Sequence, residues 1–194
     1  MKKKTFMKSS LILTLLVLLL AACSNNNNDN SSNSSEEEGM DMSSQDMEGM
    51  DMSGSGEVPE GLKVAENPKY DVGSNAIINA DHMEGMDGAE ATIVGAYDTF
   101  VYTISYTPTT GGEKVTDHKW VIQEEIEDAG DEAIEPGTEV IINAAHMEGM
   151  NGAKATIDSA EKTTVYMVDY TPTTGGEKVT NHQWVTESEL SPVE

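Results

Sequence analysis

The chain has 194 residues and a formal net charge of −24, with 35 acidic residues, 11 lysines and no arginine. Such a polyanion repels phosphate backbones and anionic lipid headgroups, so the composition excludes a nucleic-acid-binding function. Because there is a single cysteine, the chain can form neither an internal disulfide nor a thiolate metal site. The charge instead favours cations as partners.

Residues 1–22 have the features of a bacterial lipoprotein signal peptide. Lysines precede the apolar run LILTLLVLLL, which is short for a membrane-spanning helix. The LAAC sequence that follows resembles a lipobox. It implies that Cys23 becomes the lipidated first residue of the mature chain, anchored at the extracytoplasmic face of the membrane. The alternative is an ordinary signal peptide followed by a chance cysteine.

Residues 23–57 are predicted to form a disordered tether. The segment SNNNNDNSSNSS has no apolar surface to bury. Five methionines then occur among carboxylates: Met40, Met42, Met47, Met50 and Met52. A disordered tail has no core for thioethers to fill. The DMEGMDM sequence at 46–52 therefore suggests Met47, Met50 and Met52 as additional metal ligands.

The rest of the chain is an internal duplication with an offset of 64 residues, predicted to form one domain at 58–128 and a second at 129–194. Between residues 73–126 and 137–190, about 34 of 54 positions are identical without a gap. YTPTTGGEKVT occurs unchanged in both copies. Each repeat is too small to bury a large core, so we expect the two to pack together.

Each repeat is predicted to be all-β. The sequences around Ile77 and Ile141, AEATI and AKATI, FVYTISY, and KVTDHKWV show the β-branched and alternating patterns of strands. PTTGGEK supplies a tight connection, and QEEI and SEL add a single helical turn. Four or five short strands per repeat predict two tandem small barrels, similar to SH3-like or KOW-like folds.

The HMEGM motif carries the candidate metal ligands. Imidazole and thioether together suit Cu(I) or Ag(I), whereas thioether sulfur is a poor ligand for Ca²⁺, Mg²⁺ or Zn²⁺. The predicted ligands are His82, Met83, Met86, His146, Met147 and Met150. The alternative is structural: methionine closes the open end of a barrel and histidine hydrogen-bonds a strand end.

A second pair of histidines precedes the only tryptophans. His118 and Trp120, like His182 and Trp184, are two residues apart, so on a strand both rings point to one face. These residues are either further metal ligands, with the indole face covering a monovalent cation, or a core tryptophan beside a hydrogen-bonded histidine.

The lipoprotein start, the methionine-rich acidic tail and the doubled HMEGM…GA.ATI…YTPTTGG…H.WV unit resemble the YdhK family of Gram-positive lipoproteins. Some members are similar to the staphylococcal copper-tolerance surface lipoprotein, which implies copper binding outside the cell by the HMEGM residues. Asp81 and Asp87 are replaced by Ala145 and Asn151 in the second copy. Essential carboxylate ligands would therefore make the two sites inequivalent.

The expected function is to sequester Cu(I), and also Cu(II), at the cell surface, with a copper exporter or oxidase as a possible partner. No organic cofactor and no enzymatic activity are expected, because no nucleophile motif, HExxH or phosphate loop is present. One alternative is a wall- or protein-binding module that uses Tyr97, Phe100 and Tyr102 as exposed aromatics. Another is a structural Ca²⁺-binding protein, although no EF-hand loop occurs.

Overall fold

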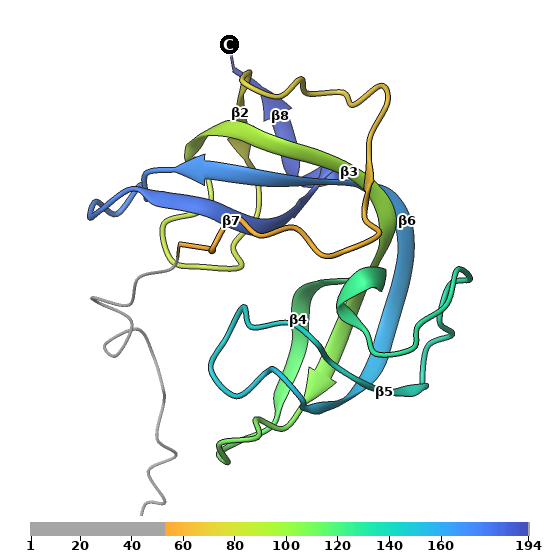
Figure 1. Cartoon of the computed structure of the whole chain (residues 1–194). Helices are drawn as coiled ribbons and strands as arrows, with labels where there is room; N and C mark the ends of the chain where they lie inside the picture. The colour runs from red at the N-terminus through yellow and green to blue at the C-terminus, as the bar shows by residue number, and fades with distance from the viewer. Residues whose placement is uncertain (1–52, 194) are drawn as a thin grey trace, which may run out of the picture. The chain divides into compact units, whose positions relative to one another are not determined.

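The computed structural model describes residues 53–193, where all regular elements are β-strands or short 3₁₀ turns (Figure 1). The elements are β1 (Lys63–Val64), β2 (Asn75–Ile78), β3 (Glu90–Tyr106), β4 (Val115–Ile122), η1 (Gln123–Glu125), β5 (Glu139–Ile141), β6 (Lys154–Tyr170), β7 (Val179–Thr186), η2 (Glu187–Glu189) and β8 (Leu190–Pro192). The all-β prediction is confirmed. No helix among these residues is long and apolar enough to cross a membrane. The predicted signal peptide, Cys23 and most of the tether lie outside the described residues.

Two 17-residue strands organise the sheet. AEATI and FVYTISY, predicted as separate strands, are the two ends of β3, and the equivalent segments of the second repeat form β6. β3 and β6 pair antiparallel along their whole length, from Ala91 opposite Tyr170 to Tyr106 opposite Ala155. Because the partner strand supplies ladder hydrogen bonds throughout, the segment between the two alternating patterns also stays extended.

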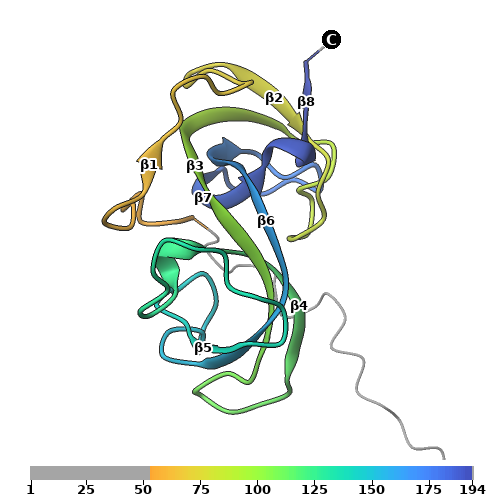
Figure 2. The same ribbon diagram turned by 90° about the vertical axis from the view of Figure 1, so that its right-hand side faces the viewer.

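Each end of the β3–β6 pair is completed by strands from both repeats. β2 and β7 lie at one end with β8, and β4 and β5 lie at the other (Figure 2). The two ends have equivalent structures: each residue at one end corresponds to the residue 64 positions away in the sequence at the other end. Leu190 pairs with Ile78 at one end, and Ile126 pairs with Ile142 at the other.

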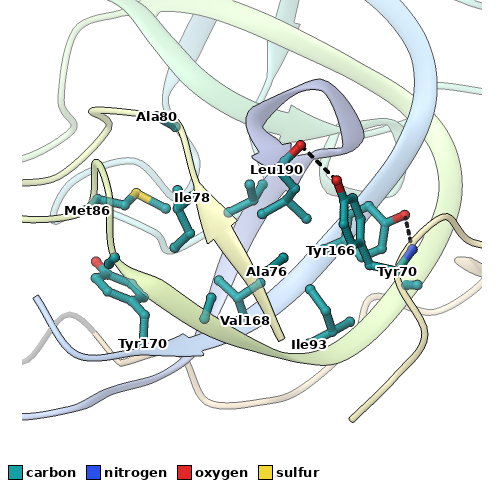
Figure 3. Close-up of a cluster of buried hydrophobic side chains, with 14 of the residues drawn as sticks. Tyr70, Ala76, Ile78, Ala80, Met86, Ile93, Tyr166, Val168, Tyr170 and Leu190 are labelled. Atoms are coloured by element: carbon teal, nitrogen blue, oxygen red, sulfur yellow. Dashed lines mark hydrogen bonds between the residues drawn. The ribbon is translucent and has the colours of Figure 1, made fainter. Parts of the chain in front are cut away.

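Each of the two main hydrophobic cores likewise contains residues from both repeats. In the first core, Ile78, Met86 and Ile93 pack with Tyr166, Val168 and Leu190 of the second repeat (Figure 3). The second core contains Tyr102, Ile104, Val121, Ile142, Met150 and Ile157. Full burial of one such side chain contributes about 1.5–3 kcal/mol to the free energy of unfolding. Each repeat therefore obtains much of its stability from the other.

A third cluster lies between these cores. It contains Val101 and Val165 from the middle of the long strands, together with Ile122, Met167 and Trp184. All are at most 4% exposed. Apolar packing thus continues from one end of the β3–β6 pair to the other.

The expected arrangement of one barrel per repeat differs from this architecture. The structure has a single eight-stranded sheet in which each core takes the first half of one repeat and the second half of the other. The alternation of apolar residues correctly predicts β-strands. It does not specify which strands pair with one another. Two nearly identical repeats can satisfy the same pattern by pairing within a copy or between copies. The predicted helical turns are present as η1 and η2.

Candidate functional site

The HMEGM loop of each repeat is held by the PTTGG loop of the other. Thr173 donates its backbone N–H to the carbonyl of Gly85 at 2.8 Å, and Thr109 does the same for Gly149. Both glycines have φ of +73°, and a Cβ at Gly85 would lie 2.6 Å from the Thr174 hydroxyl. The glycine of the motif is therefore required both by its backbone conformation and by this close approach.

The two methionines of each motif have different surroundings. Met86 and Met150 are fully buried in the first and second cores, and Figure 3 shows Met86 pointing toward Ile78 and Tyr170. Met83 and Met147 are only half-buried. Met86 and Met150 are thus core residues, as the structural alternative expects, whereas Met83 and Met147 remain accessible.

Each motif histidine contacts a carboxylate of the opposite repeat. His82 Nε2 lies 2.8 Å from Glu189 Oε1, and His146 Nε2 lies 2.7 Å from Glu125 Oε1. Burial alone would raise the pKa of Glu189, but the hydrogen bond and charge of His82, with further bonds from Thr186 and Trp120, lower it to about 2. Glu189 is therefore ionised at neutral pH.

The tryptophans bind the same carboxylates through their indole N–H groups. Trp120 Nε1 donates to Glu189 at 2.8 Å, and Trp184 Nε1 donates to Glu125 at 3.1 Å. Trp184 is fully buried in the third cluster. The ring of Trp120 is half-buried and has the Lys119 ammonium 5.4 Å from its centroid. The indole N–H groups connect the tryptophans to the motif histidines through these carboxylates, and the Trp120 ring also lies edge-to-face with the His82 ring, with 6.3 Å between the centroids.

His118 and His182 lie just after irregular positions in β4 and β7. Asp117 and Asn181 precede them with φ of +52°, and the β3–β4 and β6–β7 ladders shift register on both sides of the histidine. Asp and Asn are the non-glycine residues that most readily adopt this conformation. A bulge of this kind re-aims the following side chain.

Burial lowers the pKa of both histidines to about 4. Protonation of the nearby His82 and His146 would lower the pKa of His118 and His182 further. Both rings are therefore neutral at pH 7, so each has one ring nitrogen with a free lone pair.

All four histidines line one open cavity of about 1270 Å³. Met83 and Met147 also line it, as does the start of the described chain, Ser53–Glu60. Gly54 donates its backbone N–H to the Thr180 carbonyl at 2.8 Å, which fixes this segment beside β7. Residues that sequence analysis assigned to two separate repeats thus meet at one surface.

Within the cavity the histidines form pairs across the repeats. The ring centroids of His118 and His146 are 6.3 Å apart. The equivalent residues under the 64-residue offset are His182 and His82, which line the same cavity. The 6.3 Å contact therefore joins one histidine from each repeat.

The donor set fits a soft ion of low coordination number. Within residues 53–193, no group of three or more His, Cys, Asp or Glu side chains is placed to hold a metal ion, so a site here would also need the thioethers. His82 Nδ1 and His118 Nε2 are buried and have no hydrogen-bond partner. A spacing of 6.3 Å between ring centroids leaves room for an ion about 2 Å from a nitrogen of each ring. Met83 and Met147 follow His82 and His146 directly and provide thioethers.

Of the three aromatic residues named for a wall-binding module, Tyr102 is not at the surface, whereas Tyr97 and Phe100 are half-buried. Tyr102 is fully buried, with its hydroxyl bonded to Gln123. Tyr97 packs edge-on against Trp184 at 5.8 Å, and Phe100 packs against the second core. The candidate ligands Met47, Met50 and Met52 lie outside the described residues.

Sequence analysis did not identify Glu125 and Glu189. Both lie in the predicted helical turns, three residues after the end of the HKWVI and HQWVT strands, and were not distinguished from the many other acids. The one available signal was their identity in both copies, while neighbouring positions such as Glu124 and Ser188 differ.

Each of the two repeats of this chain matches a known protein family. The family model described as "Protein of unknown function (DUF1541)" matches twice, at residues 72–123 and 136–187. The "Uncharacterized protein YdhK" of Bacillus subtilis (strain 168) is 69% identical over 139 residues, covering 72% of this chain and 68% of that protein.

Solved structures of YdhK also match. The 2.00 Å crystal structure of the DUF1541 family protein YdhK from Bacillus subtilis is 68% identical, with a TM-score of 0.73, and the match covers 75% of this chain and 99% of that one. The solution NMR structure of the YdhK C-terminal domain is 69% identical, with a TM-score of 0.61, and the match covers 63% and 92% respectively. This chain therefore belongs to the DUF1541 family and is a homologue of YdhK with two DUF1541 repeats.

Proposed function

We propose that this protein is a lipid-anchored, non-catalytic copper-binding protein that sequesters Cu(I) outside the cytoplasm and so contributes to copper tolerance. One ion binds at each histidine pair, His118 with His146 and His82 with His182. Met147 and Met83 supply the thioethers. The sites lie between the repeats rather than within them.

The observation that carries this proposal is the meeting of paired histidines and thioethers in one cavity. His82 Nδ1 and His118 Nε2 are buried without partners there, and leaving such atoms unpaired costs about 1–3 kcal/mol each. A bound ion would offset that cost. The negative charge of the whole chain also raises the local concentration of cations and speeds their capture.

The two methionines of the motif provide a matched test of ligation against packing. We expect Met83→Leu with Met147→Leu to weaken Cu(I) binding roughly tenfold or more, about 1.4 kcal/mol, because leucine removes the sulfur that faces the cavity. The control, Met86→Leu with Met150→Leu, makes the same chemical change in the buried cores. It should cost less than about 1.5 kcal/mol in stability and leave affinity unchanged. The measurement is competition with a chromogenic chelator under reducing conditions.

Equal losses of affinity in the two variants would instead support all four motif methionines as ligands, as the sequence predicts. A third variant, with Met47, Met50 and Met52 changed to Leu, tests the tail. If the tail captures ions weakly and passes them on, this variant should lose weak binding and keep the tight sites.

Copper tolerance tests the function in the cell. A strain lacking the gene should stop growing at a lower copper concentration, and the wild-type copy should restore growth. A Cys23→Ser copy should be released from the membrane and fail to restore it, because lipidation at that residue provides the anchor. Normal tolerance of the deletion strain, in a background without redundant copper systems, would contradict the proposal.

A further inference from the structure

Glu125 and Glu189 are buried carboxylates whose oxygens are occupied by donors. Glu189 Oε1 contacts His82, and its Oε2 accepts from Trp120 and from both the backbone N–H and the hydroxyl of Thr186. Glu125 Oε1 contacts His146 and Trp184, while Oε2 accepts from the backbone N–H of Ile122. The side chains of Glu125 and Glu189 are only 5% and 12% exposed.

These contacts determine which histidine nitrogen carries the proton. An ionised carboxylate can only accept hydrogen bonds, so the 2.8 Å contact between His82 and Glu189 requires a proton on Nε2. In a neutral imidazole the other nitrogen, Nδ1, then has the free lone pair. For His82 this is the buried atom that has no partner. The same argument applies to the 2.7 Å contact between His146 and Glu125.

We propose that Glu125 and Glu189 are positioning residues, each holding the motif histidine of the opposite repeat so that it binds metal through Nδ1. This inference rests on the proposed function. A carboxylate that accepts from the outer nitrogen of a metal-binding histidine fixes the tautomer and ring orientation and raises the basicity of the ligating nitrogen.

The arrangement also explains why so acidic a protein would select a soft ion at this cavity. Glu125 and Glu189 are already hydrogen-bonded by side chains and backbone, which leaves little capacity to coordinate a hard cation. The indole N–H groups of Trp120 and Trp184 add a further donor to each carboxylate. Imidazole nitrogen and thioether sulfur are the soft donors that line this cavity, and they suit Cu(I) better than Ca²⁺ or Mg²⁺.

Nitrogen-15 NMR of the imidazole rings tests the inference in the soluble mature chain. In the metal-free protein at neutral pH, His82 and His146 should be protonated at Nε2. Addition of Cu(I) under anaerobic conditions should shift their Nδ1 resonances and leave Nε2 protonated. Protonation at Nδ1 in the metal-free protein, or metal-dependent shifts at Nε2, would overturn the inference while leaving copper binding intact.

Substitution provides the second measurement. Glu125→Gln with Glu189→Gln should lower Cu(I) affinity by about 10–100-fold, because an amide cannot accept from donors at both of its ends. Glu187→Gln, in the second turn and outside the residues that line the cavity, is the control, and it should leave affinity unchanged. Unchanged affinity in a folded Glu125/Glu189 variant would overturn the inference. A protein that shows no Cu(I)-dependent shift at any histidine would overturn the proposed function as well, and the tautomers of the metal-free protein would still be readable.

Discussion

Trp184→Ala should reduce the free energy of unfolding by about 3–5 kcal/mol, the range for removing a large buried aromatic side chain. Trp184 is fully buried in the third cluster, which also contains Val101, Ile122 and Val165. Its indole N–H also donates to the buried carboxylate of Glu125, which would lose a donor. This cluster joins the two ends of the sheet. The variant should therefore unfold in a single transition of the whole domain, at a lower urea concentration than the wild-type protein.

The control is Trp120→Ala, the equivalent change in the first repeat. Trp120 makes the same kind of bond, to Glu189, but its ring is only half-buried, so we expect a clearly smaller loss. Urea denaturation followed by far-ultraviolet circular dichroism compares the two variants without depending on tryptophan fluorescence. Equal losses, or two separate transitions for the two repeats, would contradict the shared core.

Much of the local structure could be predicted because it depends on short-range pattern. The β-branched segment at Ile77 is in β2, the alternation in FVYTISY is in β3, and KVTDHKWV is β4. The glycine of HMEGM was expected to permit a tight fold, and Gly85 has the positive φ of such a turn. These features require only the period of side-chain direction and the conformational freedom of glycine.

The exchange between repeats could not be predicted by the same reasoning. Whether Leu190 packs against its own repeat or against Ile78 depends on long-range pairing, and nearly identical copies give both choices the same pattern. The candidate site depends directly on that choice. With pairing inside a repeat, a site would be built from the histidines of one copy, whereas the exchange of strands brings the His118 ring to 6.3 Å from the His146 ring of the other copy.

Two other parts of the site had only weak signals. Asp117 and Asn181, which tolerate a positive φ, indicate the irregularity before His118 and His182, but only when their position in a strand is known. Glu125 could not be separated from the other acids, because its importance comes from burial and from its contact with His146.

The central claim is that each metal site is built from both repeats, and paired histidine substitutions test it most directly. One variant changes His118 and His146 to Asn, and the other changes His82 and His118. Asparagine removes the imidazole and retains a polar amide. Both variants lose two of the four histidines, so only the pairing differs.

Cu(I) competition titration of the soluble mature chain would measure how many tight sites remain in each variant. The structure predicts that the His118/His146 variant loses one site and keeps the other, because both residues belong to the same pair. The His82/His118 variant should lose both sites, since it breaks both pairs. The reverse result, with one site left in the His82/His118 variant and none in the His118/His146 variant, would mean that each repeat binds its own ion.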